Sequence, residues 1–200
     1  MMKRHGVVRH MPFQKSTVYG TRRSGMFNFL KKKQTLEPEI QIVPLTEEPG
    51  KEIICAPIQG EAVPSSEISD PTFQQEMLGK GIAIKPAVGK VFAPADGKIE
   101  MMIDSLHAVS MTTAGGVEVL IHVGLDTVAL KGRHFKGCVK EGDTVKRGDL
   151  LIEFDMEAIK AEGYDTISPV IICNTDDYSG IERVTGKQVQ VGEAVIKLTK

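Results

Sequence analysis

Hydrophobic and polar positions alternate most regularly in the stretch from Gly116 to Val128. Because successive side chains of an extended strand point to opposite faces, one face of this stretch is apolar and the other carries His122, Gly124 and Asp126. The apolar face consists of Val117, Val119, Ile121, Val123 and Leu125. The pattern predicts a half-buried strand whose imidazole points away from the hydrophobic core.

Short apolar runs continue along the chain from about residue 51, separated by Gly, Pro or Asp. Their spacing of about eight to twelve residues is typical of an all-β sandwich or barrel. The expected strands are residues 53–55, 81–84, 90–92, 108–111, 117–123, 150–154, 170–172 and 194–198. Helix is expected only as short turns at 73–78, 156–161 and 177–183.

Two sequence patterns are repeated within the chain. Cys55–Gly60 recurs 37 positions later as Phe92–Gly97, and the glycine-rich pattern of residues 142–152 recurs 44 positions later at residues 186–196. Repeated turns with repeated apolar spacing predict duplicated hairpins that close a sheet on itself. The expected fold is therefore a compact antiparallel β-sandwich or barrel. Chance similarity of turn composition is the alternative explanation.

The repeated-hairpin interpretation places two histidines together. His107 and His122 lie at similar distances on either side of a turn near Ala114, so antiparallel pairing brings them near each other. Two adjacent imidazoles offer a nucleophilic nitrogen and a hydrogen-bond donor, which suits transfer of a phosphoryl group onto histidine. Backbone N–H groups near Gly124 are expected to help stabilise phosphate oxygens. A half-buried histidine satisfied by a backbone group remains the simpler alternative.

Composition narrows the classes of function. The 25 basic and 26 acidic residues nearly balance, which argues against a general nucleic-acid binder. No apolar run is long enough to cross a bilayer. Cys55, Cys138 and Cys173 are widely separated and lack Cys-x-x-Cys spacing, so neither a disulfide scaffold nor a zinc knuckle is indicated. The expected location is the cytoplasm.

The N-terminal quarter differs in composition from the rest. Residues 1–25 are basic and lack hydrophobic periodicity, which predicts a disordered extension without a secretory signal. Residues 26–50 are expected to form a basic N-terminus and a linker, and residues 51–200 the folded domain. The Phe, Leu and Lys residues of 27–33 allow at most weak contact with an anionic membrane surface, with a plain flexible tail as the alternative.

Four motifs identify a family resemblance: Ser105-x-His107, Val119–Val128 with His122 near its start, Gly79–Pro86 and Pro94–Gly97. Together they closely resemble the glucose-type enzyme IIA of the sugar phosphotransferase system. The resemblance runs from about Ile53 to the C-terminus, and its histidine-centred signature is highly specific. It implies a β-sandwich and places an enzyme IIA type-1 domain at residues 51–200.

The resemblance also implies roles for individual residues. His122 matches the histidine that carries the phosphoryl group on Nε2, and His107 matches the second active-site histidine, which hydrogen-bonds the phosphate oxygens. Asp70 and Asp126 match acidic residues that face a basic side of the phosphate donor. Phe73 matches an apolar docking residue beside them.

One residue of the site departs from the family pattern. Ser105 occupies a position where the family commonly has threonine. Serine keeps the hydroxyl that can fix the tautomer of His107 but lacks the methyl group, so we expect tuned rather than lost activity.

The partners that the resemblance implies are two proteins. A small histidine-containing phosphocarrier protein supplies the phosphoryl group, and a cysteine of a membrane-associated IIB domain receives it before it passes to the sugar. Regulatory target proteins are further candidate partners, because the unphosphorylated form of some relatives regulates transporters or enzymes. No cofactor and no nucleic acid are expected.

Two other classes of protein share parts of these patterns. Residues 139–151 resemble the hairpin of lipoyl and biotinyl carrier domains, with Lys160 as a candidate attachment site, although Lys160 is expected in a helical turn. His122 and Asp126 have a spacing that also occurs in zinc hydrolases, which need a third ligand. Zinc bound adventitiously by His107 and His122, or shared with a partner, is the remaining metal hypothesis. ATP is not expected as the donor, because no P-loop ending is present.

Overall fold

The computed structural model describes residues 40–46 and 51–200. The expected N-terminal extension at 1–25, the membrane-surface contact at 27–33 and most of the expected linker lie outside these residues. The boundaries after residues 25 and 50 therefore stay predictions. Within the described segments, no helix is long and apolar enough to cross a membrane.

The described chain is mostly β-structure, which confirms the predicted fold class. Its strands are β1 (Lys51–Cys55), β2 (Gly60–Pro64), β3 (Lys80–Pro86), β4 (Lys90–Phe92), β5 (Gly97–Met102), β6 (Ala108–Thr113), β7 (Glu118–His122), β8 (Phe135–Gly137), β9 (Thr144–Val145), β10 (Leu150–Phe154), β11 (Ser168–Ile172), β12 (Gly180–Arg183), β13 (Lys187–Val189) and β14 (Ala194–Thr199). The helices are α1 (Pro71–Gln74) and α2 (Met156–Ala161), with 3-10 turns at Ser65–Glu67, Thr127–Leu130 and Thr175–Asp177.

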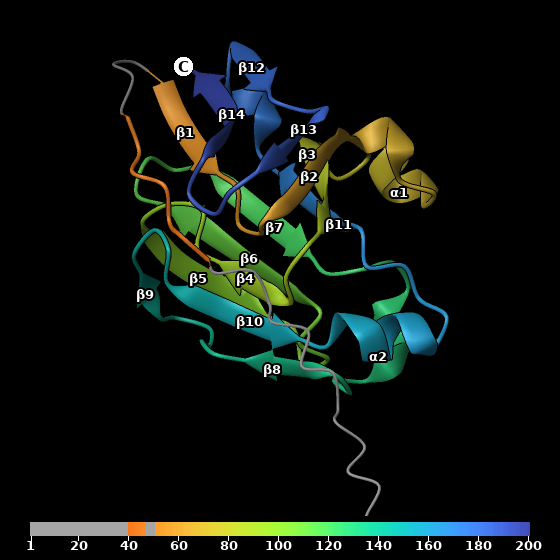
Figure 1. Ribbon diagram of the computed structural model, residues 1–200. Coiled ribbons are helices and arrows are strands. Elements are labelled where there is room, and N and C mark those ends of the chain that lie inside the picture. The colour runs from red at the N-terminus through yellow and green to blue at the C-terminus, as the bar shows by residue number, and fades with distance from the viewer. Residues whose placement is uncertain (1–39, 47–50) are drawn as a thin grey trace, which may run out of the picture. The chain divides into compact units, whose positions relative to one another are not determined.

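The strands form three antiparallel sheets. The largest has eight strands in the order β13-β2-β3-β11-β7-β6-β5-β9. The other two have three strands each, β1-β14-β12 toward the top of Figure 1 and β4-β10-β8 toward its bottom. The histidine-bearing β7 lies near the middle of the eight-stranded sheet, so its backbone is paired on both sides, by β6 and β11.

All eight predicted strands coincide with observed strands, but six others were not predicted. Those six are β2, β5, β8, β9, β12 and β13. β8, β9 and β13 have at most three residues, β5 and β12 are largely exposed, and β2 buries only Ala62 and Val63 among its apolar side chains, so no apolar run marks these strands. The expected helical turn at 177–183 is wrong over most of its length, because β12 pairs there with β14. The helical turn expected at 73–78 is observed as α1, which ends at Gln74. It ends before residue 78 because Glu76 adopts a positive φ of 55°.

Hydrogen bonds confirm that the sequence repeats are structural repeats. In the first copy, Ala56 N donates to Glu193 O at 2.7 Å. In the second copy, Ala93 N donates to Asp149 O at 2.8 Å. The two donor residues are 37 positions apart and the two acceptor residues are 44 positions apart. These are the separations of the two repeated sequence patterns. The two three-stranded sheets are thus equivalent halves of a duplicated hairpin motif.

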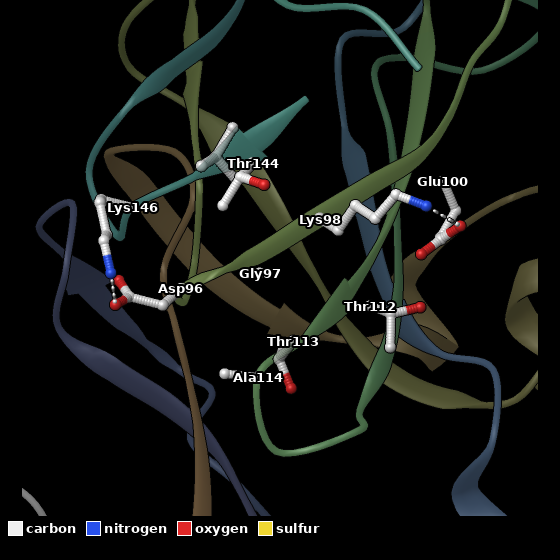
Figure 2. A pocket seen from close by; sticks show the side chains of 10 residues that line it. Asp96, Gly97, Lys98, Glu100, Thr112, Thr113, Ala114, Thr144 and Lys146 are labelled. Carbon is white, nitrogen blue, oxygen red and sulfur yellow. Dashed lines mark hydrogen bonds and ion pairs between the residues drawn. The ribbon is translucent and has the colours of Figure 1, made fainter. Parts of the chain in front are cut away.

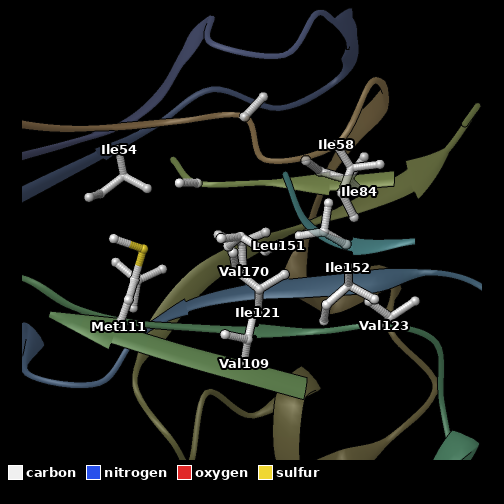
Figure 3. Close-up of a cluster of buried hydrophobic side chains, with 14 of the residues drawn as sticks. Ile54, Ile58, Ile84, Val109, Met111, Ile121, Val123, Leu151, Ile152 and Val170 are labelled. Carbon is white, nitrogen blue, oxygen red and sulfur yellow. The ribbon is translucent and has the colours of Figure 1, made fainter. Parts of the chain in front are cut away.

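The main hydrophobic core contains residues from all three sheets. Side chains from the eight-stranded sheet, such as Val109 and Ile121, meet Ile54, Leu151 and Ile152 from the small sheets (Figure 3). Each of these residues is at most 1% exposed. Burying a side chain of this size contributes about 1.5–3 kcal/mol, so this layer dominates the stability of the fold.

A second, smaller apolar cluster lies on the opposite face of the eight-stranded sheet. Alternation along β7 sends Val119 and Ile121 into the main core and Leu120 to the other face, against the second cluster. The buried members of that cluster are Val63, Ile68, Phe73, Ala83, Leu125, Ile167 and Ile171. Helix α1 contributes Phe73 and covers this face. His122 lies on the same face as Leu120, as the alternating pattern predicted.

Residues 40–46 lie against the folded domain without forming a helix or strand. Val43 N donates to Val191 O at 2.9 Å, and Arg147 Nη1 donates to Val43 O at the same distance. Ile42 fits closely against Gly192, where an added Cβ would approach the Ile42 side chain to 3.0 Å. A part of the expected linker is therefore held in place by backbone pairing and close packing.

Candidate functional site

The β6–β7 hairpin brings the two predicted histidines into contact. Ala108 pairs with His122 across the hairpin, and Val123 N donates to His107 O at 2.7 Å. The ring centroids of His107 and His122 are 4.7 Å apart, and the rings meet edge to face at 79°. The expected proximity of the two imidazoles is thus confirmed.

The tautomer of His122 follows from its hydrogen bond. Its Nδ1 lies 2.8 Å from Gly124 O, and a carbonyl oxygen can only accept, so Nδ1 carries the proton. Nε2 is then left with a lone pair, which is the form of imidazole that acts as a nucleophile. Gly124 has a φ of 74°, and a Cβ there would lie 2.6 Å from Asp165 O. Glycine is required for the carbonyl to reach the ring.

His107 is held by a hydroxyl group. The ring is only 3% exposed, and Ser105 Oγ lies 2.8 Å from its Nδ1. When the hydroxyl donates to Nδ1, the ring proton lies on Nε2, which becomes a donor. Leu106 has a positive φ of 56° and turns the chain sharply between the two residues. In that arrangement the pair supplies one nucleophilic nitrogen, on His122, and one hydrogen-bond donor, on His107.

Burial keeps both rings neutral near pH 7. Burial and, to a smaller extent, the charge of a protonated His122 together lower the pKa of His107 to about 4. Burial also lowers the pKa of His122, while the Gly124 carbonyl and the carboxylates of Asp70 and Asp126 act in the opposite direction. A neutral His122 retains the lone pair that a nucleophile needs.

We expect both histidines to titrate below the ordinary value of 6.5. The Cε1 proton resonance of His107 should show its midpoint near pH 4 in an NMR titration, because protonation places a charge in a buried site. Since the folded-state pKa is below the unfolded one, the stability from a neutral His107 is complete above pH 6.5 and declines toward pH 4. Titration of His107 at or above 6.5 would contradict the buried geometry.

Helix α1 carries two of the predicted site residues. Asp70 caps the helix, and its Oδ1 accepts a hydrogen bond from Thr72 N at 2.7 Å. Pro71 follows at the first helical position, where its missing N–H leaves no bond unmade. The Phe73 ring lies 5.1 Å from the His122 ring, centroid to centroid, and is 7% exposed. The largely buried Phe73 ring thus packs close to the His122 ring. The docking role expected for Phe73 stays a prediction.

Asp126 is exposed and ends the loop that follows β7. It has a positive φ of 56° and precedes the 3-10 turn at Thr127–Leu130. Its carboxylate and that of Asp70 are both close enough to His122 to influence the pKa of the ring. The structure therefore brings the five other predicted residues to the two imidazoles: Asp70, Phe73, Ser105, Gly124 and Asp126.

Comparison with known proteins identifies the family and the fold. Residues 52–178 match the family model of the phosphoenolpyruvate-dependent sugar phosphotransferase system, EIIA 1. The chain belongs to this family. The fold also matches the solved glucose permease IIA of Mycoplasma capricolum, with a TM-score of 0.68 and 29% identity over 78% of this chain and 99% of that one.

The curated relatives of this EIIA domain include separate EIIA components and longer multidomain components. The glucose-specific EIIA component of Oceanobacillus iheyensis is 42% identical over 73% of this chain and 88% of that protein. The beta-glucoside-specific EIIBCA component of Bacillus subtilis is 45% identical over 78% of this chain. The chain spans about a quarter of the length of such EIIBCA relatives, 26% in the B. subtilis protein and 23% in that of Dickeya chrysanthemi.

Sequence reasoning did not assign two residues of the candidate site. Thr127 is fully buried, and its Oγ1 donates to Val123 O at 2.6 Å. Asp165 O accepts a hydrogen bond from Leu125 N at 3.0 Å. Thr127 lies within the Val119–Val128 motif, which marked the residue as a candidate, but the sequence did not indicate that its hydroxyl contacts Val123. Asp165 acts through its backbone and is distant in sequence, so no residue pattern marks it.

A hollow in the EIIA domain lies away from the histidines. Its lining residues come mainly from β5, β6 and β9 and the adjoining loops (Figure 2). Its volume is about 350 Å³. Its lining residues are Asp96, Gly97, Lys98, Glu100, Thr112, Thr113, Ala114, Thr144, Val145 and Lys146. Both lysines are paired, Lys98 with Glu100 at 3.7 Å and Lys146 with Asp96 at 2.8 Å. None of the predicted site residues lines this hollow.

The comparisons do not support the alternative classes. Lys160, the candidate attachment lysine, lies in α2 and pairs with Glu157 at 3.4 Å. In the parts of the chain that the structure describes, no three His, Cys, Asp or Glu side chains are grouped to hold a metal ion. Tetrahedral zinc needs four ligands, so His107 and His122 would hold it only with groups from elsewhere. Zinc shared with a partner stays a prediction.

Proposed function

We propose that this domain accepts a phosphoryl group on Nε2 of His122 and passes it to a partner. The observation that supports the proposal is the hydrogen bond from His122 Nδ1 to Gly124 O, because it leaves Nε2 unprotonated beside His107. The donor is the phosphohistidine of the small phosphocarrier protein. The acceptor is a cysteine of a IIB domain, in keeping with the EIIBCA names of several relatives.

Both transfer steps are displacements at phosphorus. The Nε2 lone pair of His122 attacks, the new N–P bond forms, and the carrier's N–P bond breaks with its electron pair left on the carrier's imidazole. In the second step the thiolate of the IIB cysteine attacks phosphorus and forms an S–P bond. His122 then leaves as a neutral imidazole with its proton on Nδ1, the tautomer that the Gly124 carbonyl favours.

His107 stabilises the charge on the transferred group in this proposal. Its Nε2–H donates to a phosphoryl oxygen, with the proton kept on Nε2 by the Ser105 hydroxyl at Nδ1. Because the pKa of His107 is about 4, the ring is a neutral donor at pH 7 and does not compete for a proton with His122. Both rings lie in a partly water-excluded site, where such a hydrogen bond is stronger than in water.

We also propose that the choice of sugar lies outside this domain. Glucose-specific and beta-glucoside-specific relatives are 42% and 45% identical to the chain, respectively. Such similar domains therefore serve systems with different sugars. In this interpretation the domain is a glucose-type phosphoryl carrier, and the membrane partner selects the substrate.

The test of the proposed function is a single incubation. The protein is mixed with phosphoenolpyruvate, enzyme I and the phosphocarrier protein, and its intact mass is measured. One phosphoryl group should be added, in a bond that is labile in acid and stable in base, as a phosphohistidine is. Omitting the phosphocarrier should prevent labelling, and labelling by ATP alone would contradict the proposal.

Neutralising Asp70 and Asp126 should slow association with the phosphocarrier. Asparagine is the appropriate replacement, because it retains the capping oxygen of residue 70 and tolerates the positive φ of residue 126. We expect the association rate of the double variant to fall about threefold to tenfold at low salt, through lost electrostatic steering.

Stopped-flow measurements at several salt concentrations test this expectation. The difference from the unmodified protein should shrink as salt screens the charges. The matched control neutralises two exposed acids that are not among the carboxylates acting on the pKa of His122, Glu141→Gln with Glu157→Gln, and should change the rate little. An unchanged salt dependence in the Asp70 and Asp126 variant would argue against their role in docking.

A further inference from the structure

Thr127 connects the end of the loop that follows β7 to its start, because its side chain bonds to Val123. The Thr127 side chain is fully buried, and its hydroxyl donates to Val123 O at 2.6 Å. The side chain of Val123 is anchored in the main core (Figure 3). The backbone N–H of Val123 also bonds to His107 O. The Val123 carbonyl therefore has a fixed direction, set by the core, the hairpin and the Thr127 hydroxyl.

The next peptide unit connects the loop to His122. Gly124 O accepts the His122 Nδ1 proton at 2.8 Å, while Leu125 N donates to Asp165 O at 3.0 Å. This carbonyl and this N–H belong to one peptide unit, so each hydrogen bond polarises the group that makes the other. The direction of the Gly124 carbonyl thus determines where the proton on the His122 ring resides.

The methyl group of Thr127 restrains the same peptide unit. A Cβ built on Gly124 would lie 2.6 Å from Thr127 Cγ2, which shows that this methyl group lies directly against the Gly124 backbone. The hydroxyl holds the carbonyl before Gly124, and the methyl limits rotation of Gly124 itself. One side chain thus restrains the loop on both sides of the residue that bonds His122.

We propose that Thr127 is a positioning residue that keeps the proton of His122 on Nδ1 and thereby keeps Nε2 free. It acts through Val123 and Gly124 and does not touch the transferred group. The inference rests on the proposed role of His122 as phosphoryl acceptor, and it adds the element that maintains the reactive tautomer. A hydroxyl that merely satisfied a buried carbonyl would affect stability without affecting the tautomer.

The test compares Thr127→Val with Thr127→Ser. Valine keeps the shape and removes the hydroxyl, whereas serine keeps the hydroxyl. Nitrogen-15 NMR of the imidazole rings at neutral to mildly basic pH reports which nitrogen carries the proton. The unmodified protein and Thr127→Ser should show His122 protonated on Nδ1, and Thr127→Val should show a measurable Nε2–H fraction.

The rate of phosphoryl acceptance provides the second measurement. We expect Thr127→Val to accept the group about tenfold more slowly, the size of effect typical of supporting residues, and Thr127→Ser to recover most of the rate. Unchanged tautomer and unchanged rate in a less stable Thr127→Val protein would overturn the inference. If Thr127→Val does not fold, Thr127→Ala removes both the hydroxyl and the methyl group. Its comparison with Thr127→Ser, which lacks the same methyl group, then isolates the effect of the hydroxyl.

The outcomes separate this inference from the proposed function. A His122 ring protonated on Nε2 in the unmodified protein overturns the positioning role directly, without any variant. Failure of the phosphocarrier to label His122 overturns the proposed function, while the tautomer measurement still decides the role of Thr127.

Discussion

The His122→Ala variant should accept no phosphoryl group from the phosphocarrier. The substitution removes the only atom proposed to form the N–P bond, and no neighbouring group can replace it at the same position. His107 is the nearest imidazole, but its Nδ1 is engaged by Ser105 and the ring is 3% exposed. The expected result is complete loss of the added mass after incubation with phosphoenolpyruvate, enzyme I and the phosphocarrier.

His134→Ala is the matched control for this experiment. His134 is a partly exposed histidine whose Nε2 lies 2.7 Å from Glu162 Oε1, in the loop before β8. This variant removes one imidazole, as His122→Ala does, and should still be labelled once. Labelling of His122→Ala at the rate of the unmodified protein would refute His122 as the acceptor. Circular dichroism of both variants checks that loss of labelling does not reflect unfolding.

Replacing His107 with glutamine should impair onward transfer more than acceptance. The amide of glutamine can donate to a phosphoryl oxygen, so phosphohistidine should still form on His122. The amide lacks the rigid ring that Ser105 orients at Nδ1, so it cannot hold the donor where charge develops during transfer to the IIB cysteine. We expect the rate of onward transfer to fall about 100-fold, as is typical when one such donor is removed.

Single-turnover transfer from the labelled variant to a IIB domain measures this effect. Ser105→Thr is the control, because it keeps the hydroxyl at Nδ1 and should transfer at nearly the rate of the unmodified protein. Ser105→Ala should lie between the control and His107→Gln, since it frees the ring of His107 to change tautomer. Full onward transfer by His107→Gln would show that the assigned role is wrong.

Much of the site was predictable because it is built from local patterns. The two-residue period of Val117 to Val123 placed His122 opposite the core, and the close turn at Ala114 placed His107 beside it. Backbone pairing in a short hairpin depends on residues near one another in the chain, so spacing alone carries this information. The family resemblance then supplied roles for residues such as Asp70, which lies far from the hairpin in sequence.

The fold class was predictable, whereas the shortest strands were not. Apolar runs marked the strands that face the main core, such as β10 and β14. β9 has two residues and β12 is largely exposed, so both become strands only because a neighbouring strand offers hydrogen bonds. In the same way, no local pattern predicted that residues 40–46 would pair with Val191 and Arg147.

By itself, the sequence determined the β-rich fold, the duplicated hairpins and the meeting of His107 with His122, because periodicity and short loops are local properties. Only the tertiary structure decided which nitrogen of His122 is free, how deeply Phe73 is buried and how Thr127 and Asp165 hold the loop. These features depend on carbonyl directions and on contacts between distant segments. Such contacts exist only when all three sheets have assembled around the core.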